Sequence, residues 1–346
     1  MPKKTEGDTA RRPVPDILIV GAGPTGIAIG AEARMAGLEP LLVDRGPLTA
    51  NLLEFPTYMG FFTTRDLLEI ARIPFAIPED KPDLRQAVTY YRAVAARFQL
   101  PLAPYEEVSG VGREGDLFRI TSRSRGELRQ RQARAVALAT GYFHNPRVLE
   151  VRGADSPWVH TRYRDPYRHF GERVVVVGGG NSAVEAALDL YRNGAKVTLV
   201  HRGSKVKSSV KYWLRPDLQN RLEEGALEAR FESRVRAFSD LGVEIEGPRG
   251  PEVLAADAAY LLIGYLPDVE LERQCGIEVD SDTLIPTFDP ETCESNVEGL
   301  YVAGTLQAGK RTDKIFIENS REHGRQIVRH LKSRLRPQTT TEPPGR

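Results

Sequence analysis

The chain has 346 residues, which is enough for about two domains with hydrophobic cores of their own. Its 48 basic and 47 acidic residues give a formal net charge of +1, which argues against nucleic-acid binding as its main activity. The longest apolar run is broken by glycine, proline and charged residues, so we expect neither a membrane span nor a signal sequence, and a cytoplasmic location. Residues 1–13 and 337–346 are polar and rich in charge, proline or threonine, and we expect them to be disordered.

The first predicted element is a buried strand that runs into a glycine turn, D-I-L-I-V-G-A-G-P-T-G, over residues 16–26. In this pattern the first glycine makes a tight turn, the second lets the backbone approach a pyrophosphate, and the third lets a helix pack on the strand. That helix, expected over residues 24–36, would aim its free N–H groups at the phosphates. Asp44 follows Gly21 by 23 residues and suits the ribose hydroxyls of FAD or NAD, whereas it would repel a 2′-phosphate.

The middle of the first unit shows helical and then alternating patterns. Apolar residues at three- and four-residue steps predict a helix over residues 83–99. Short alternating segments between about residues 102 and 139 predict strands, the last of which ends in a turn at Ala139 to Gly141. The arginine-rich residues 119–134 are expected to form a solvated β-meander, with docking of an acidic partner protein as the less favoured interpretation.

A second copy of the nucleotide motif, R-V-V-V-V-G-G-G-N-S-A, occupies residues 173–183 and precedes a helix expected over residues 181–193. His201 follows Gly178 by 23 residues, so it stands where the first copy has its acidic residue. This histidine repels no anion, and nearby cations can donate hydrogen bonds to a 2′-phosphate: Arg202, Lys205 and Lys207. A lone glycine motif is weak evidence, but two copies with a selecting residue at the same offset predict two nucleotide sites, the second preferring NADPH to NADH.

The last part of the chain returns to a strand and turn, G-L-Y-V-A-G-T at residues 299–305, and to a helix expected over residues 315–335. If this helix packs on the first unit, the second unit is an insertion between two halves of the first. We therefore predict an α/β fold of two Rossmann-like (βαβ) dinucleotide-binding domains. The FAD-binding parts are placed at residues 14–160 and 284–336, and the NADPH-binding domain at residues 161–283.

Few side chains qualify as catalytic candidates. His323, on the final helix, could donate a proton to a leaving thiolate, although a packed or exposed helical histidine is the more ordinary role. Arg311 and Lys314 could stabilise a reduced flavin, and simple surface charge is the competing interpretation. Cys275 and Cys293 lie 18 residues apart, which excludes a Cys-x-x-Cys pair and a disulfide framework, and we expect them to have no redox role. No metal site is predicted.

Together these segments resemble, over nearly the whole chain, the flavoproteins with two dinucleotide-binding domains that include thioredoxin reductase. Two stretches outside the nucleotide motifs, N-L-L-E-F-P-T-Y-M-G-F-F-T-T-R-D-L-L and I-F-I-E-N-S-R-E-H-G, resemble YpdA-type flavoproteins, described as bacillithiol disulfide reductases. The resemblance, with the motifs, implies that FAD is bound by Gly21, Gly23, Pro24, Thr25, Gly26, Asp44, Arg45, Val108, Thr140, Gly141, Gly304 and Thr305. NADPH would be bound by Gly178, Gly180, Asn181, Ser182, Ala183, His201, Arg202, Lys205 and Lys207.

The chain departs from these families at three places. Thr305 stands where they usually have an aspartate that contacts the flavin ribitol, and the redox dithiol of thioredoxin reductases is missing. Thr25 stands where YpdA-type proteins have a cysteine, and a hydroxyl cannot form a mixed disulfide. Thr25 is nevertheless a catalytic candidate, because a hydroxyl at a helix start can donate to phosphate or flavin. A plain helix-start residue is an equally consistent interpretation.

The predicted activity is transfer of electrons from NADPH through FAD to a low-molecular-weight disulfide such as bacillithiol disulfide. A ferredoxin- or flavodoxin-NADP reductase that uses a small redox protein is the alternative. A flavin monooxygenase ranks lower, because His160 follows Gly153 by seven residues and not by the four of that class's F-x-G-x-x-x-H signature. A flavoprotein that senses NADPH without turnover is a further alternative. A homodimer or a higher homo-oligomer is expected from the resembling families and from base rates.

Overall fold

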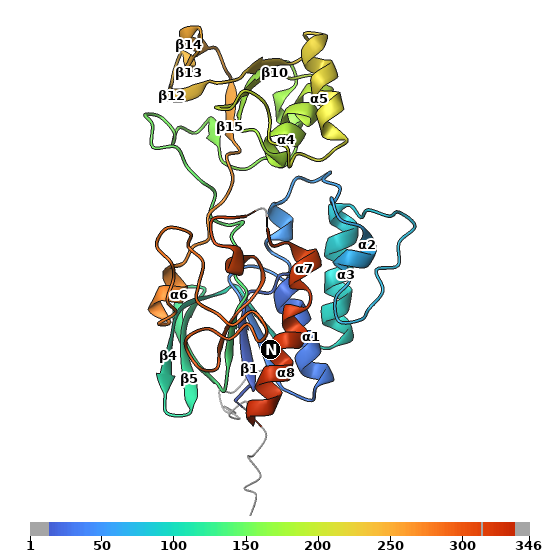
Figure 1. The fold of residues 1–346 in the computed structure, drawn as a ribbon, viewed down its shortest axis with the longest axis vertical. Helices are drawn as coiled ribbons and strands as arrows, with labels where there is room; N and C mark the ends of the chain where they lie inside the picture. Colours follow the sequence, from blue (N-terminus) through green and yellow to red (C-terminus); the bar gives the residue numbers. More distant parts are fainter. Residues whose placement is uncertain (1–13, 313, 336–346) are drawn as a thin grey trace, which may run out of the picture.

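The computed structural model describes residues 14–312 and 314–335, and it has two α/β lobes joined by connecting segments (Figure 1). The predicted disordered segments, residues 1–13 and 337–346, lie outside the described residues. The first lobe contains a five-stranded parallel sheet in the order β16-β7-β1-β2-β3. Its strands are β1 (Ile17–Val20), β2 (Pro40–Asp44), β3 (Leu102–Pro104), β7 (Val136–Leu138) and β16 (Leu300–Val302). The strands at the two ends of the chain therefore share one sheet, which confirms the predicted insertion.

The two faces of this sheet are covered by different kinds of structure. Side chains alternate along β1, so that Ile17 and Ile19 join the core under the helices while Leu18 and Val20 join the core under a β-meander. The helices of this lobe are α1 (Pro24–Met35), α2 (Arg65–Leu68), α3 (Leu84–Arg97), α7 (Ile317–Ser320) and α8 (His323–Leu335). The meander consists of β4 (Glu106–Glu114), β5 (Leu117–Ser124) and β6 (Glu127–Ala133), and α6 (Glu270–Gln274) packs beside it. Both faces are thus buried, as a parallel sheet requires.

The arginine-rich meander is mainly solvated, as predicted, but one of its arginines pairs with a buried carboxylate. Glu106 is almost fully buried and accepts two hydrogen bonds of 2.7 Å from Arg131 and one of 2.7 Å from Ser122. Burial raises the pKa of the Glu106 carboxyl, but the bonds from Arg131 and Ser122 outweigh it and leave the pKa lowered. One arginine of the stretch therefore serves the fold and not a partner.

The second lobe repeats the same plan, with a parallel sheet in the order β11-β10-β9-β15-β8. Its strands are β8 (Val159–His160), β9 (Arg173–Val177), β10 (Lys196–Val200), β11 (Glu228–Arg230) and β15 (Ala258–Leu261). Helices α4 (Asn181–Arg192) and α5 (Leu214–Glu223) share one hydrophobic core with the sheet, and a hairpin sheet packs on another. That hairpin sheet is formed by β12 (Arg234–Ser239), β13 (Gly242–Gly247) and β14 (Gly250–Leu254). Helices α1 and α4 match their predicted ranges within one residue at each end.

The structure differs from two of the predicted domain boundaries, those after residues 160 and 283. Strand β8 was placed in the first domain, but it pairs with β15, and Leu149 and Val151 pack on the core of the second lobe. Residues 271–283 were placed in the second domain, but Leu271 and Ile277 pack on the core of the first lobe. These connecting segments carry no glycine motif, so their apolar residues did not reveal which core they join.

The predicted helix over residues 315–335 is interrupted in the structure, where α7 and α8 are separated by two residues. The Asn319 side chain accepts a hydrogen bond from the Phe316 N–H (2.7 Å) and donates one to the Lys314 carbonyl (2.8 Å). Such side-chain bonds compete with helical backbone bonds, and α7 begins at Ile317 and not at the predicted residue 315. Gly324 lies against the Ala28 backbone, where an added Cβ would stand 2.9 Å from the Ala28 carbonyl, so α8 needs glycine to pack this closely on α1.

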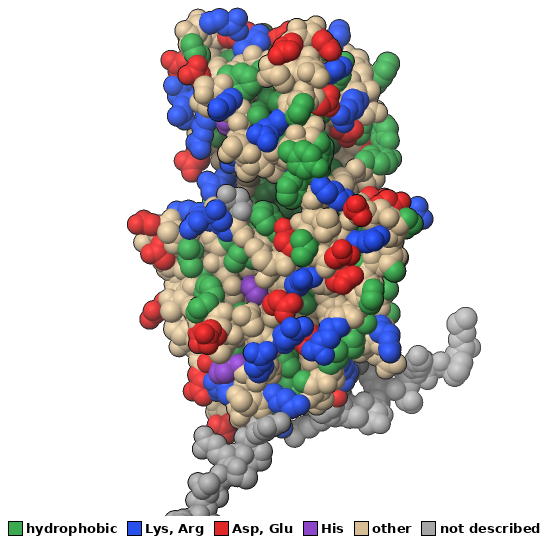
Figure 2. All heavy atoms as spheres, turned by 45° about the vertical axis from the view of Figure 1, so that its right-hand side comes forward, with side chains coloured by type: hydrophobic (Ala, Val, Ile, Leu, Met, Phe, Trp, Pro, Cys, Tyr) green, Lys and Arg blue, Asp and Glu red, His purple; other side chains and the backbone are tan. Residues whose placement is uncertain are grey.

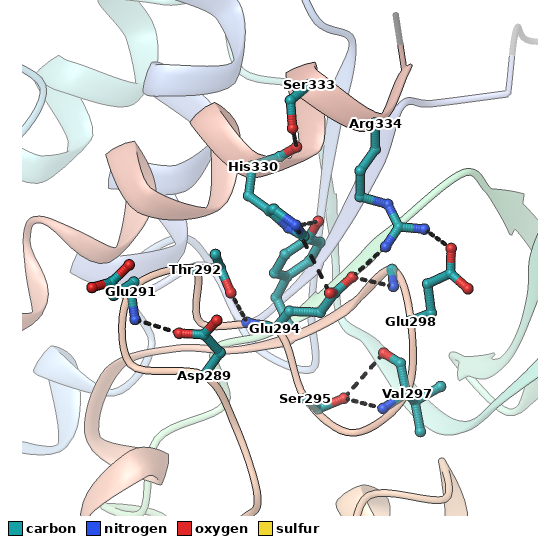
Figure 3. Close-up of polar contacts among 12 residues, drawn as sticks. Asp289, Glu291, Thr292, Glu294, Ser295, Val297, Glu298, His330, Ser333 and Arg334 are labelled. Carbon is teal, nitrogen blue, oxygen red and sulfur yellow. Dashed lines mark hydrogen bonds and ion pairs between the residues drawn. The ribbon is translucent and has the colours of Figure 1, made fainter. Parts of the chain in front are cut away.

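A polar network ties α8 to the loop that leads into β16 (Figure 3). Glu294 accepts hydrogen bonds of 2.7 Å from the Gly299 N–H and from Arg334, which also pairs with Glu298. On β16 itself, the Tyr301 hydroxyl lies 3.1 Å from Nδ1 of His330. These contacts fix β16, and therefore the turn at its carboxyl end, relative to α8. No helix in the described ranges is long and apolar enough to cross a membrane.

Candidate functional site

A cavity of about 730 Å³ opens at the carboxyl ends of the first sheet, within the range of about 300–1,000 Å³ that is usual for ligand sites. Ligands bind at this edge of parallel α/β sheets because loops and helix N-termini converge there. Ten of the twelve predicted FAD-binding residues line it: Gly21, Gly23, Pro24, Thr25, Asp44, Arg45, Thr140, Gly141, Gly304 and Thr305.

The first glycine loop makes a sharp turn that only glycine residues can form. Gly21 has φ of +109°, and an added Cβ would stand 2.4 Å from the Ala139 carbonyl. Gly26 does not line the cavity, and its role is packing, because its Cβ would stand 1.9 Å from the Gly21 carbonyl. The side-chain amide of Asn51, which the sequence did not point to, lies 3.0 Å from the Cβ position of Gly23. Gly21 and Gly23 line the cavity, so the loop backbone faces it.

Asp44 is held by two backbone donors beside this loop. One carboxylate oxygen accepts from the Ala22 N–H and the other from the Gly46 N–H, both at 2.7 Å. Burial raises the pKa of Asp44 although both donors and Arg45 act to lower it. A carboxylate has about four acceptor positions, so two remain for ligand hydroxyls. The fixed orientation of Asp44 fits recognition of a ribose diol.

Two further turns, which follow β7 and β16, line the cavity beside the glycine loop. Gly141 and Gly304 have φ of +67° and +72°, and an added Cβ on Gly304 would stand 3.0 Å from the Thr25 hydroxyl. That hydroxyl lies 3.2 Å from the hydroxyl of Ser320, a cavity residue that the sequence did not single out. Thr25 therefore has a polar partner from the end of α7, on the other half of the first domain.

Besides Gly26, Val108 is the predicted FAD-binding residue that does not line the cavity. Val108 packs on the core under the meander, and its neighbour Glu107 reaches the cavity instead. Because side chains alternate along a strand, a prediction that misses by one residue selects the opposite face. The Val108 side chain therefore faces the core, and the side chain that lines the cavity here is that of Glu107.

Loop residues that the sequence did not reveal form a polar rim on the cavity. Arg162 donates to the Glu54 carboxylate at 2.7 Å and to the His144 carbonyl at 3.0 Å, and Arg164 lines the same region. Burial, helped by Arg45, lowers the pKa of His144 to about 4, so its ring is neutral near pH 7. These residues belong to no local motif, and only the fold brings them together.

The candidate acid His323 has a structural partner. Its Nδ1 accepts a hydrogen bond of 3.0 Å from the Gly304 N–H, and burial lowers its pKa to about 4. It does not line the cavity, so the structure supports the packed-histidine interpretation. Arg311 and Lys314 are exposed and also lie outside the cavity lining, which favours the surface-charge interpretation.

Both cysteines are buried, free and poorly suited to thiol chemistry. Burial raises the pKa of Cys275 to about 12 and that of Cys293 to about 11. Neither lines the cavity. Since the thiolate is the reactive form, these shifts agree with the prediction that neither residue has a redox role.

The second glycine loop has a matching geometry in the second lobe. Gly178 has φ of +151°, and its Cβ would stand 2.8 Å from the Ala183 side chain, so strand and helix approach closely. The His201 ring lies against Gly179, where an added Cβ would stand 2.4 Å from Cε1. Burial, with Lys207 and Arg202 nearby, lowers the pKa of His201, so the ring is neutral at pH 7.

The cations after His201 are available to an anion. Arg202, Lys205 and Lys207 are exposed, and among the described residues no ion pair joins them to an acid. The Lys207 N–H donates to the Gly179 carbonyl at 2.8 Å, and Asn181 binds the same segment through the Ser209 carbonyl (3.2 Å) and the Lys211 N–H (2.8 Å). Asn181 is therefore a positioning residue that ties this segment to the start of α4.

Comparison with known proteins decides the family. The model described as "Pyridine nucleotide-disulphide oxidoreductase" matches residues 18–304. The chain belongs to this family. It is an oxidoreductase that uses FAD and NADPH, as predicted from its two nucleotide motifs, and its fold is that of the thioredoxin reductase-like flavoproteins.

The chain is also similar along nearly its whole length to individual proteins. It is 31% identical to the bacilliredoxin reductase Bdr of Bacillus subtilis (strain 168), covering 92% of this chain and 97% of that protein. The solved bacillithiol disulfide reductase Bdr (YpdA) from Bacillus cereus has a TM-score of 0.90 and 30% identity, with 92% of this chain and 99% of that one covered. The Staphylococcus aureus structure of the same name has a TM-score of 0.88 and 32% identity, with 93% and 99% covered. The predicted resemblance to YpdA-type flavoproteins is confirmed.

Proposed function

We propose that this chain reduces a low-molecular-weight disulfide of the bacillithiol disulfide class, with NADPH as the electron donor. One observation carries the proposal. Several cavity residues come from segments 51–68 and 315–324, outside both nucleotide motifs: Asn51, Leu53, Glu54, Ile317 and Ser320. The same segments carry the resemblance to YpdA-type proteins, whose solved members are named bacillithiol disulfide reductases. The likeness thus extends to cavity walls that lie outside the two nucleotide motifs.

We propose the first-lobe cavity as the FAD site. FAD, when bound, supplies the two-electron relay between NADPH and the acceptor. The backbone of the Gly21–Gly26 loop and the positive end of α1 suit its pyrophosphate. Asp44 suits the adenosine ribose, and the Thr305 hydroxyl, at the end of β16, takes the place of the family's usual carboxylate.

The second lobe suits NADPH. The Gly178–Ala183 loop and the start of α4 would bind its pyrophosphate in the same way. Neutral His201 contributes no charge there, so the attraction for a 2′-phosphate falls to Arg202, Lys205 and Lys207. The proposed preference for NADPH over NADH rests on these cations and on the absence of an acid at position 201.

The proposed reduction of the acceptor needs no thiol on the protein. Cys275 and Cys293 are buried away from the cavity, and position 25 offers a hydroxyl beside Ser320. The chain's own residues can therefore orient a disulfide by hydrogen bonds but cannot form a mixed disulfide with it. The balanced reaction converts NADPH, one proton and one disulfide into NADP⁺ and two thiols.

The experiment is a steady-state assay of the FAD-loaded protein with bacillithiol disulfide, in which NADPH oxidation and thiol release are measured together. The expected result is two thiols released for each NADPH oxidised. The double variant Cys275→Ala, Cys293→Ala serves as the control and should keep the wild-type rate. NADPH oxidation that releases no thiol, and that instead needs ferredoxin or oxygen, would contradict the proposal.

A further inference from the structure

One contact joins the proposed 2′-phosphate site to the other lobe. Lys211 stands a few residues after the cations of that site, and it is buried, with 7% of the residue exposed. Its ammonium group pairs with Glu185 of α4 and donates a hydrogen bond of 3.1 Å to the Gly60 carbonyl of the first lobe. A buried cation is stable only where its donors find acceptors, and one acceptor here belongs to the opposite domain.

The same segment also makes an aromatic contact across the lobes. The Trp213 ring stacks on Phe62 of the first lobe, with centroids 5.6 Å apart and an interplanar angle of 16°. The Lys81 ammonium of the first lobe lies 4.0 Å from the centroid of the Trp213 ring. Figure 2 shows hydrophobic side chains gathered where the two lobes meet. These contacts, with the Lys211–Gly60 bond, are called the clasp below.

Both sides of the clasp are fixed to nucleotide-binding structure or to the core. On the first lobe, Gly60 forms a β-bridge with Asp83, and Asp83 caps α3 by accepting from the Gln86 N–H at 2.7 Å. On the second lobe, Asn181 at the start of α4 holds the Lys211 N–H at 2.8 Å. The segment that carries Arg202 and the lysines is therefore linked to the flavin lobe by direct contacts.

We propose that the clasp makes Lys211, Trp213 and Phe62 specificity-determining positioning residues. A 2′-phosphate bound by Arg202 and the lysines would hold the segment after His201 in place, so that Lys211 and Trp213 keep their contacts with the first lobe while the lobes are docked for electron transfer. The 2′-phosphate is remote from the reacting atoms, so any effect it has on the rate of flavin reduction must act through such a contact. If so, part of the preference for NADPH is expressed in the rate of flavin reduction and not in the affinity for the nucleotide. This inference rests on the proposed NADPH site.

The test measures the limiting rate of flavin reduction by NADPH and by NADH under anaerobic conditions, together with the affinity for 2′,5′-ADP. The holoprotein is compared with Lys211→Met and with Phe62→Ala, which lies on the exposed side of the clasp and leaves the nucleotide segment intact. Lys196→Met, an exposed lysine outside the clasp, is the matched control, and Trp213→Phe keeps an aromatic ring and should retain the wild-type rates.

We expect wild-type flavin to be reduced at least about fivefold faster by NADPH than by NADH, as is common for coupled sites. This ratio should fall towards one in Lys211→Met and Phe62→Ala, while 2′,5′-ADP affinity stays within about twofold. Equal limiting rates for the two nucleotides in the wild type, or an unchanged ratio in both variants, would refute the coupling between the lobes. Neither result would refute the NADPH site. If the wild type binds 2′,5′-ADP no better than 5′-AMP, the NADPH site itself is wrong, and the coupling falls with it.

Discussion

Replacement of Asp44 by asparagine tests the proposed FAD site most sharply. Two of the about four acceptor positions of the carboxylate are used by the Ala22 and Gly46 N–H groups, which leaves two for ribose hydroxyls. Asparagine has one acceptor oxygen, and its amide would turn a donor towards another donor. Loss of two charge-assisted hydrogen bonds, at about 1.5–3 kcal/mol each, costs about 3–6 kcal/mol. The Kd for FAD should therefore rise by about two to four orders of magnitude.

The assay is titration of the apoprotein with FAD, followed by the quenching of flavin fluorescence. Asp16→Asn is a matched control, because Asp16 also accepts a backbone N–H, from Glu39 at 2.9 Å, but lies outside the cavity lining. It should leave the Kd for FAD unchanged. If Asp44→Asn binds FAD within about threefold of the wild type, Asp44 does not contact the ribose and the reasoning fails.

Three other changes have expected outcomes. Arg202→Ala should raise the NADPH concentration needed by one to two orders of magnitude, roughly 1.5–3 kcal/mol, and barely affect NADH; equal losses in initial-rate measurements would refute the 2′-phosphate role. Glu272 is buried with both carboxylate oxygens unpartnered among the described residues, and burial raises its pKa to about 7. Its folded-state pKa is above the ordinary 4.5, so stability is lost as pH rises from 4.5 to 7. Glu272→Met should therefore raise the thermal midpoint more at pH 8 than at pH 5. The gain in unfolding free energy should differ between the two pH values by roughly 2–3 kcal/mol, and the same gain at both would argue against a charged carboxylate. His323 has its pKa lowered from 6.5 to about 4, so its contribution is present above pH 6.5 and lost as pH falls towards 4. His323→Asn, whose oxygen can still accept from the Gly304 N–H, should lose less stability than the wild type in urea melts between pH 6.5 and 4.5; identical losses would show that His323 does not titrate in this range.

The two nucleotide motifs could be predicted because their physics is local. The strand, the glycine turn and the helix start of residues 17–26 and 174–184 are adjacent in sequence. Gly21, Gly26 and Gly178 are each required by a contact within a few residues or with the end of the neighbouring strand. The offset of 23 residues from Gly21 to Asp44 and from Gly178 to His201 follows from one βαβ unit, so equal counting located both selecting positions.

The rest of the site depends on contacts between distant parts of the chain. Glu54 meets Arg162 across 108 residues, and Lys211 meets Gly60 across 151, so no local pattern could reveal either pair. The partner of Thr25 is Ser320, 295 residues away. The boundary errors at residues 160 and 283 have the same cause, since the core that a connecting segment joins is decided by three-dimensional packing. The case of Val108 is different, because the strand was predicted and only the side of the strand on which its side chain lies was not.

The central claim is that electrons from NADPH pass through FAD on this chain to a low-molecular-weight disulfide without a protein thiol. The most direct measurement is an anaerobic stopped-flow titration of the holoprotein that follows flavin absorbance on addition of NADPH and then of bacillithiol disulfide. We expect NADPH to bleach the flavin, the disulfide to restore its absorbance within the turnover time, and the double variant Cys275→Ala, Cys293→Ala to behave identically. Flavin that stays reduced with the disulfide, and is reoxidised only by ferredoxin or by oxygen, would contradict the claim.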